Sequence, residues 1–251
     1  MTAAVAVPVL VCAVTACGTD GSGGGGARGE GRGERAGGSP DGAAGAGGSG
    51  GAAGGGPVRP QDERRLASAL LKDGDVRGYR AQRNKQDALP PENTMSADRR
   101  ECAPVADTVD SRPEYARTAY VSGTVAEGDL GTGSVLQQVL LASYKAGDAR
   151  KWLAELKRSV GECERFTGSV GTGEQARLVI EPGEDVGVGD DSVRFTMKDA
   201  RGKDSPTVFT VVRAGDSTAT FMSVGVSGEP VPVAEPVVAK QHEKLAAAER
   251  S

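Results

Sequence analysis

Glycine is distributed very unevenly along the chain, and this limits what part of it can fold. About half of the 38 glycines lie between Gly18 and Gly56, in a tract whose other residues are only Ala, Ser, Thr, Pro, Asp, Glu and Arg. Such a tract has almost no apolar surface to offset the entropy of ordering it. We therefore predict a disordered Gly-rich linker, followed by a single folded domain over residues 60–251 that is long enough to bury a core.

The charge pattern excludes one class of partner. The 251-residue chain carries a net charge of −4, and its Lys and Arg residues are scattered rather than clustered. Nucleic-acid binding needs a basic surface patch, so we expect no nucleic acid as a partner. No apolar run reaches the 18 or more residues typical of a transmembrane helix.

The first sixteen residues, MTAAVAVPVLVCAVTA, contain no charged side chain and have the length of a signal-peptide core. The residues at their end, Val14-Thr15-Ala16-Cys17-Gly18, resemble the bacterial lipobox. That resemblance implies cleavage before Cys17 and lipidation, including palmitate, of this cysteine. The segment has no Lys or Arg at its start, so we expect the natural start to lie upstream. The alternatives are a plain secretory signal and a chance cysteine.

We interpret residues 17–59 as a tether behind the lipidated cysteine. About forty flexible residues have a root-mean-square reach of about 35 Å, which places the domain beyond the membrane surface. The segment Gly47–Gly51 matches the GxSxG nucleophile pattern, but that pattern needs a strand before it and a helix after it. In low-complexity sequence we interpret it as linker.

The cysteines favour an oxidising compartment. Cys12 leaves with the signal peptide and Cys17 carries lipid, so Cys102 and Cys163 remain as an even pair. Each falls on an apolar helical face: Cys102 with Val105, Ala106 and Val109, and Cys163 with Trp152, Leu156 and Val160. We predict a disulfide between them, with two buried free thiols as the alternative. These cysteines and one histidine are too few ligands for a zinc site.

The order of predicted elements indicates an α+β domain. Residues 61–74 form an opening helix that stops at Gly74, residues 78–84 a short strand, and residues 85–98 a loop. Two strands follow at residues 117–125 and 134–144, then a helix with Asp148 as its N-cap. Five short alternating segments with tight turns, from Arg165 onward, predict an antiparallel meander. A last helix begins near Pro236, with Val238, Gln241 and Leu245 on one side.

The predicted elements follow a definite order. A helix with Leu70-Leu71, Asp73-Gly74 and Gly78-Tyr79 comes first, followed by a cysteine-bearing helix and a strand pair. A Trp-containing helix that ends in cysteine, a meander and a final helix complete the order. Over residues 62–249 this order resembles the extracellular sensor domain of mycobacterial PknH-type kinases, which actinobacterial lipoproteins share. The resemblance implies a non-enzymatic extracytoplasmic domain with a cleft for an unidentified ligand. That family usually has two disulfides, whereas this chain offers one pair. A lipoprotein α+β fold of the PsbP/Mog1 type is the alternative.

Each candidate catalytic feature has a simpler interpretation. His242 lies at the margin of a helix, where histidines usually pack or face solvent. Gly171–Ala176 matches GxGxxA, but a strand follows it instead of the helix that dinucleotide binding needs. Glu184, Asp185, Asp190 and Asp191 lack the calcium-binding spacing of an EF-hand, so we interpret them as a solvated turn.

We therefore expect no catalytic residue, no metal and no cofactor. The functional prediction is a membrane-anchored extracytoplasmic lipoprotein on the outer face of the cell membrane, whose sensor-like domain binds a small-molecule, lipid or protein ligand without catalysis. The alternatives are a lipid carrier with an apolar cavity near Trp152 and a cell-envelope hydrolase that uses carboxylates.

Overall fold

The domain is built on a single antiparallel sheet of nine strands. The computed structural model describes residues 60–85, 89, 94–128, 135–225 and 228–250. The elements, in chain order, are α1 (Pro60–Ala69), β1 (Tyr79–Arg83), β2 (Met95–Ala97), the 3₁₀ helix η1 (Arg100–Cys102), α2 (Ala103–Ala106), β3 (Ala119–Glu127), β4 (Val135–Ser143), α3 (Asp148–Glu162), β5 (Arg165–Val170), β6 (Gln175–Pro182), β7 (Asp191–Asp199), β8 (Thr207–Ala214), β9 (Ser217–Gly225) and α4 (Glu235–Glu249).

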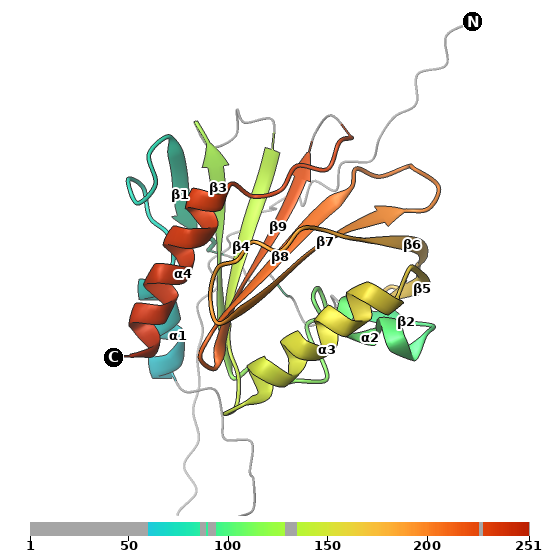
Figure 1. Cartoon of the computed structure of the whole chain (residues 1–251), viewed down its shortest axis with the longest axis horizontal. Helices are drawn as coiled ribbons and strands as arrows, with labels where there is room; N and C mark the ends of the chain where they lie inside the picture. The colour runs from blue at the N-terminus through green and yellow to red at the C-terminus, as the bar shows by residue number, and fades with distance from the viewer. Residues whose placement is uncertain (1–59, 86–88, 90–93, 129–134, 226–227, 251) are drawn as a thin grey trace, which may run out of the picture. The chain divides into compact units, whose positions relative to one another are not determined.

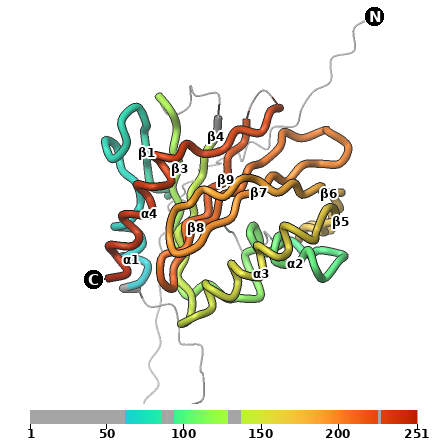
Figure 2. The backbone as a smooth tube through the Cα atoms, viewed as in Figure 1, coloured from blue at the N-terminus to red at the C-terminus, as the bar shows by residue number. Residues whose placement is uncertain are grey.

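The strand order across the sheet is β1-β3-β4-β9-β8-β7-β6-β5-β2. The predicted meander is confirmed as β5 to β9, and its last strand returns to pair with β4 along nine residues. Figure 2 shows how α3 carries the chain from β4 to the far side of the sheet before the meander brings it back. The α+β fold class with an antiparallel sheet is thus confirmed.

The helices form two layers, one on each face of the sheet (Figure 1). α1 and α4 pack together on one face, where Leu66, Leu70, Val238 and Leu245 are buried with apolar residues of β3, β4, β8 and β9. α2 and α3 cover part of the other face, over residues of β5 to β8. The central strands β8 and β9 are consequently buried along most of their length on both faces.

Two local predictions are wrong. Residues 85–98 were expected to be a loop, but Met95–Ala97 form β2, which pairs with β5 at the sheet edge. A three-residue edge strand is too short to produce an alternating pattern in the sequence. Asp148 was expected to be the N-cap of α3, but it is the first helical residue, and the N-cap is Gly147 with φ of 81°. A left-handed conformation at this position favours glycine.

The predicted disulfide between Cys102 and Cys163 is confirmed, with the two Cα atoms 5.2 Å apart. Both cysteines are fully buried. They lie at helix ends rather than within helical faces: Cys102 ends η1, and Cys163 is the C-cap of α3. The Ser159 hydroxyl donates to the Glu101 carbonyl at 2.5 Å and holds the same two elements together.

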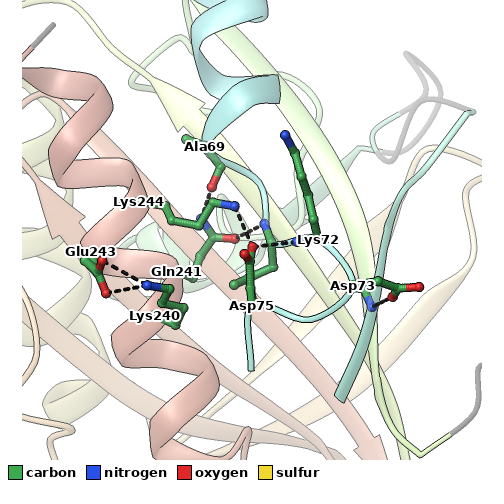
Figure 3. Close-up of polar contacts among 10 residues, drawn as sticks. Ala69, Lys72, Asp73, Asp75, Lys240, Gln241, Glu243 and Lys244 are labelled. Atoms are coloured by element: carbon green, nitrogen blue, oxygen red, sulfur yellow. Dashed lines mark hydrogen bonds and ion pairs between the residues drawn. The ribbon is translucent and has the colours of Figure 1, made fainter. Parts of the chain in front are cut away.

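Gln241 joins the first and last helices (Figure 3). Its side chain is fully buried. Its Nε2 donates to the Ala69 carbonyl at 2.7 Å, and its Oε1 accepts the Leu71 amide at 3.1 Å. A helix end leaves backbone groups without partners, and one amide side chain here satisfies two of them. Close by, Lys244 contacts Asp75 at 2.5 Å.

We expect Gln241→Leu to lower the free energy of unfolding by about 3 kcal/mol, because a buried carbonyl and a buried amide both lose their partner. Urea denaturation of the oxidised chain measures this loss. Lys240→Gln on the same helix is the control, because Lys240 pairs with Glu243 at the surface and takes no part in the bonds of Gln241. An equal effect of the two substitutions would contradict the assigned role of Gln241.

Removing the disulfide with Cys102→Ala and Cys163→Ala together should lower the free energy of unfolding by up to about 4 kcal/mol, because the bridge closes a loop of sequence separation 61. Dithiothreitol should shift the wild-type midpoint toward that of the double variant and leave the variant unchanged. A midpoint that does not respond to reduction would show that the bridge contributes no stability.

Candidate functional site

α3 does not cover the whole of the sheet face on which it packs, and a pocket lies on the part beside it. α3 packs over β6, β7 and β8, whereas the same face of β3, β4 and β9 lies beside a hollow. The side chains and backbone that line it come from Leu89, Thr108, Val109, Ser122, Gln138, Val139, Leu140, Thr220 and Met222. We call this hollow the sheet pocket. Its cavity volume is about 70 Å³, and the empty space reaches about 460 Å³ when its opening to solvent is included.

The floor of the sheet pocket consists of two rows of cross-strand neighbours. Ser122, Leu140 and Thr220 form one row, because Leu140 pairs with Ser122 on one side and Thr220 on the other. In the next row Gln138 pairs with Met222. Directly opposed residues of an antiparallel sheet project from the same face. Each row therefore places polar and apolar side chains next to each other.

The roof of the sheet pocket comes from Leu89 and from the turn that follows α2. Thr108 and Val109 follow α2, and their amides bond to the carbonyls of Val105 and Ala106, which prolongs the helix by a turn. Leu89 is buried over the strands, with its carbonyl 3.4 Å from the Tyr120 hydroxyl. Since the disulfide attaches Cys102 to the end of α3, it also fixes where the α2 turn and its roof residues lie.

A cluster of charges holds the loop that follows Thr108 and Val109. Arg117 donates to the carbonyls of Asp110 at 2.6 Å and Asp107 at 3.0 Å. The Asp110 carboxylate accepts the amides of Met95 and Arg112. The Asp107 carboxylate accepts the Glu114 amide at 3.1 Å. These groups therefore serve the backbone of the loop, and none of their side chains lines the sheet pocket.

Asp107 is electrostatically strained in this loop. Burial raises its pKa to about 6, with a smaller raising effect from the Asp110 carboxylate. The bond from the Glu114 amide and the charge of Arg117 lower the pKa but do not offset the burial. At neutral pH the folded protein thus holds this carboxylate ionised at a free-energy cost that the unfolded chain does not bear.

A second hollow lies on the surface between α2 and α3 and is rich in charge. Its lining includes Arg100, Glu101, Glu114, Glu155, Arg158 and Glu162. The Tyr115 hydroxyl donates to Glu155 at 2.7 Å, and this bond raises the pKa of Tyr115 to about 12. A glycosidase needs a carboxylic acid with a raised pKa. The pKa of Glu101 is instead lowered, and Asp107 does not line this groove.

The sequence candidates for catalysis are not brought together. His242 is half-buried on α4, on the opposite face of the sheet from the sheet pocket, and it lies beside Gly189. Gly171–Ala176 includes the turn of the β5–β6 hairpin, closed by a bond from the Gly173 amide to the Val170 carbonyl. Within the described ranges no group of acidic, His and Cys residues is arranged to hold a metal.

The acidic segment 184–191 is more ordered than a solvated turn. Lys157 of α3 contacts Asp191 at 2.6 Å and Asp185 at 3.8 Å, and Asp185 also accepts a bond from the Ser192 hydroxyl. Asp190 pairs with Arg213 at 3.1 Å. These contacts attach the segment to α3 and β8. Cys17 and Gly47–Gly51 lie outside the described residues.

Sequence reasoning did not identify the residues of the sheet pocket. One signal was present: the strand segments SVLQQVLLASY and TATFMSVGVS carry Gln138 and Thr220 among apolar residues. Polar residues inside a strand usually face solvent, so the alternation alone does not indicate a pocket. Trp152, beside which a lipid cavity was considered, stacks on Tyr144 with ring centroids 5.7 Å apart and lines neither hollow.

The fold is similar to that of a solved extracellular domain. The crystal structure of the extracellular domain of PknH from Mycobacterium tuberculosis superposes with a TM-score of 0.50 at 10% sequence identity, covering 79% of this chain and 100% of that one. An uncharacterised protein from Mycobacterium smegmatis, an Rv0999 orthologue, gives a TM-score of 0.35 at 14% identity over 78% of this chain and 98% of its own. No family model and no curated protein matches the sequence.

We expect Asp107→Asn to stabilise the domain at pH 7.5 by about 1 kcal/mol, after allowance for solvent screening. The asparagine Oδ1 still accepts the Glu114 amide, and the cost of holding a carboxylate is removed. Because the pKa of Asp107 is raised in the folded state, the contribution of its protonated form to the free energy of unfolding is full below about pH 4. That contribution is lost as the pH rises through 6.

Melting midpoints from pH 4 to 8 test this expectation. The gap between Asp107→Asn and wild type should close toward pH 4. Asp98→Asn is the matched control, because Asp98 also accepts a backbone amide, that of Thr167, but lies exposed. A gap that stays constant with pH would mean that ionisation of Asp107 is not its cause.

Proposed function

We propose that this chain is a membrane-anchored extracytoplasmic lipoprotein whose sensor-like domain binds a ligand in the sheet pocket without catalysis. The observation that carries the proposal is the sheet pocket itself. Its lining combines apolar side chains with a few hydrogen-bonding groups, as the lining of a small-molecule site does. The likeness to the PknH extracellular domain supports an extracytoplasmic setting.

The lining of the sheet pocket supports binding rather than chemistry. It offers the hydroxyls of Thr108, Ser122 and Thr220, but a hydroxyl nucleophile needs an adjacent base. Within the described part of the chain, neither a histidine nor a carboxylate lines the pocket. In the groove with several glutamates the pKa of Glu101 is lowered and Glu155 accepts a bond from the Tyr115 hydroxyl, which does not suit either as a proton-donating acid, so ligand binding is the better supported function.

A small ligand is better supported than a lipid with paired acyl chains. The cavity volume of the sheet pocket is only about 70 Å³, and nearly half of its lining residues carry polar side chains. The region around Trp152, where a lipid cavity was considered, is occupied by the core: Trp152 is 2% exposed. We therefore place the lipid in the anchor and the ligand in the sheet pocket.

The anchor is proposed from the sequence and from the disulfide. Disulfides persist in oxidising compartments, so the Cys102–Cys163 bridge supports export. In the described part of the chain no helix has the length and apolar character needed to cross a bilayer. Lipidation of Cys17 then supplies attachment, and residues 17–59 supply the reach between membrane and domain.

Cys17→Ala should release the full-length protein from the membrane fraction of a bacterial host that processes lipoproteins. Wild-type protein should remain with the membranes, and its N-terminal peptide should carry the added mass of lipid. Cys12→Ala is the matched control, because Cys12 precedes the proposed cleavage point. Unchanged fractionation and N-terminal mass in the Cys17 variant would refute the anchor while leaving ligand binding to be judged separately.

A further inference from the structure

We propose that the sheet pocket selects an uncharged molecule with an apolar body and at least one hydroxyl or amide-like group. This inference rests on the proposed function and specifies the class of ligand. It follows from the charges around the pocket, from its hydrogen-bonding side chains and from the alternation of polar and apolar residues on its floor.

Among the residues that the structure describes, no side chain that lines the sheet pocket carries a formal charge. The lining residues are five apolar ones, Leu89, Val109, Val139, Leu140 and Met222, and four neutral polar ones, Thr108, Ser122, Gln138 and Thr220. A charged ligand would lose its water on entry and meet no opposite charge. That loss is costly in an apolar setting, so the pocket discriminates against ions.

The described charges that adjoin the roof residues Thr108 and Val109 are engaged elsewhere. Asp107 and Asp110 lie next to the roof residues Thr108 and Val109, but their carboxylates accept backbone amides of the loop. Arg117 donates to two carbonyls of the same loop. Recruiting any of these groups to an ionic ligand would break the loop that forms the roof.

Two polar side chains on the floor remain available to a ligand. The Ser122 hydroxyl accepts a bond from the side-chain amide of Asn84 at 3.1 Å, and the Thr108 hydroxyl donates to the Pro104 carbonyl at 3.4 Å. Across the residues that the structure describes, no side-chain hydrogen bond engages Gln138 or Thr220. An amide and a hydroxyl offer both donors and acceptors, which match a neutral polar group.

The available polar groups alternate with apolar ones. Thr220 pairs with Leu140 and Gln138 pairs with Met222, so each polar side chain lies beside an aliphatic or thioether side chain. A purely apolar ligand would leave the amide and the hydroxyl without partners, and a purely polar one would not cover Leu140 and Met222. The combination fits a molecule that is apolar along its body and polar at one end.

Three probes with the same eight-carbon chain separate the possibilities: 1-octanol, octanoate and octylammonium. Each is titrated at pH 7.4 into the oxidised full-length Cys17→Ala chain, which is free of lipid and detergent. Methyl NMR of the methionines gives both affinity and place, because Met222 lines the sheet pocket while Met197 lies in the core beneath α3. We expect 1-octanol to shift the Met222 methyl with a Kd at least tenfold lower than either ion.

Variants of the two available side chains test the assignment. Thr220→Val keeps the shape and removes the hydroxyl, so the Kd for 1-octanol should rise about fivefold, as for one hydrogen bond. Thr196→Val is the matched control on the other face of the sheet and should leave the Kd unchanged. Gln138→Glu should shift the preference to octylammonium and Gln138→Lys to octanoate, because each supplies the missing opposite charge.

The outcomes separate the inference from the proposed function. Tighter binding of octanoate or octylammonium than of 1-octanol by the Cys17→Ala chain would overturn the inference and leave ligand binding intact. No shift of the Met222 methyl with any probe would overturn both. Binding of 1-octanol that does not respond to Thr220→Val or to the charge substitutions at Gln138 would also overturn the inference, because the alcohol then lies elsewhere.

Discussion

The pairing of β4 with β9 is the contact on which the rest of the domain depends. Nine consecutive residue pairs, from Val135 with Gly225 to Ser143 with Ser217, join a strand from the first half of the domain to the last strand of the meander. At one end the hydroxyls of Ser143 and Ser217 lie 3.0 Å apart, buried. Without this pairing the domain would be a two-strand hairpin with β1 and a separate meander, each with an uncovered face.

The sheet pocket is a consequence of the same pairing. Its floor combines Ser122 of β3, Leu140 and Gln138 of β4, and Thr220 and Met222 of β9, so it exists only where the two halves meet. Its roof depends on a second long-range link, since the disulfide attaches the α2 turn to the end of α3. The pocket therefore lies between two elements that the rest of the fold holds in place.

Both edges of the sheet are protected by an aspartate. On β1 the Ala81 amide donates to Asp73 at 2.8 Å, and on β2 the Met95 amide donates to Asp110 at 3.1 Å. Unpaired edge amides are sites where another strand can add, and a carboxylate that accepts one blocks that addition. Asp110 has a double role, because the loop that it holds also carries part of the roof of the sheet pocket.

The sequence by itself determined the elements whose local signals are strong. Turn residues between the alternating segments after Arg165 specified the meander, and the even pair of cysteines specified the bridge, because both are properties of neighbouring residues or of simple counting. The apolar side of the last helix, where Gln241 lies between Val238 and Leu245, was also predicted from the sequence. The edge strand Met95–Ala97 was not, since three residues that pair on one side only leave no periodic pattern.

Only the tertiary structure decided the site. Ser122, Gln138 and Thr220 come from three strands, and the meander between them sets which strands are neighbours and in which register. Register across a long connection depends on packing of the whole sheet, which no short segment encodes. The sequence thus specified the fold class, and the close approach of segments far apart in the chain created the pocket.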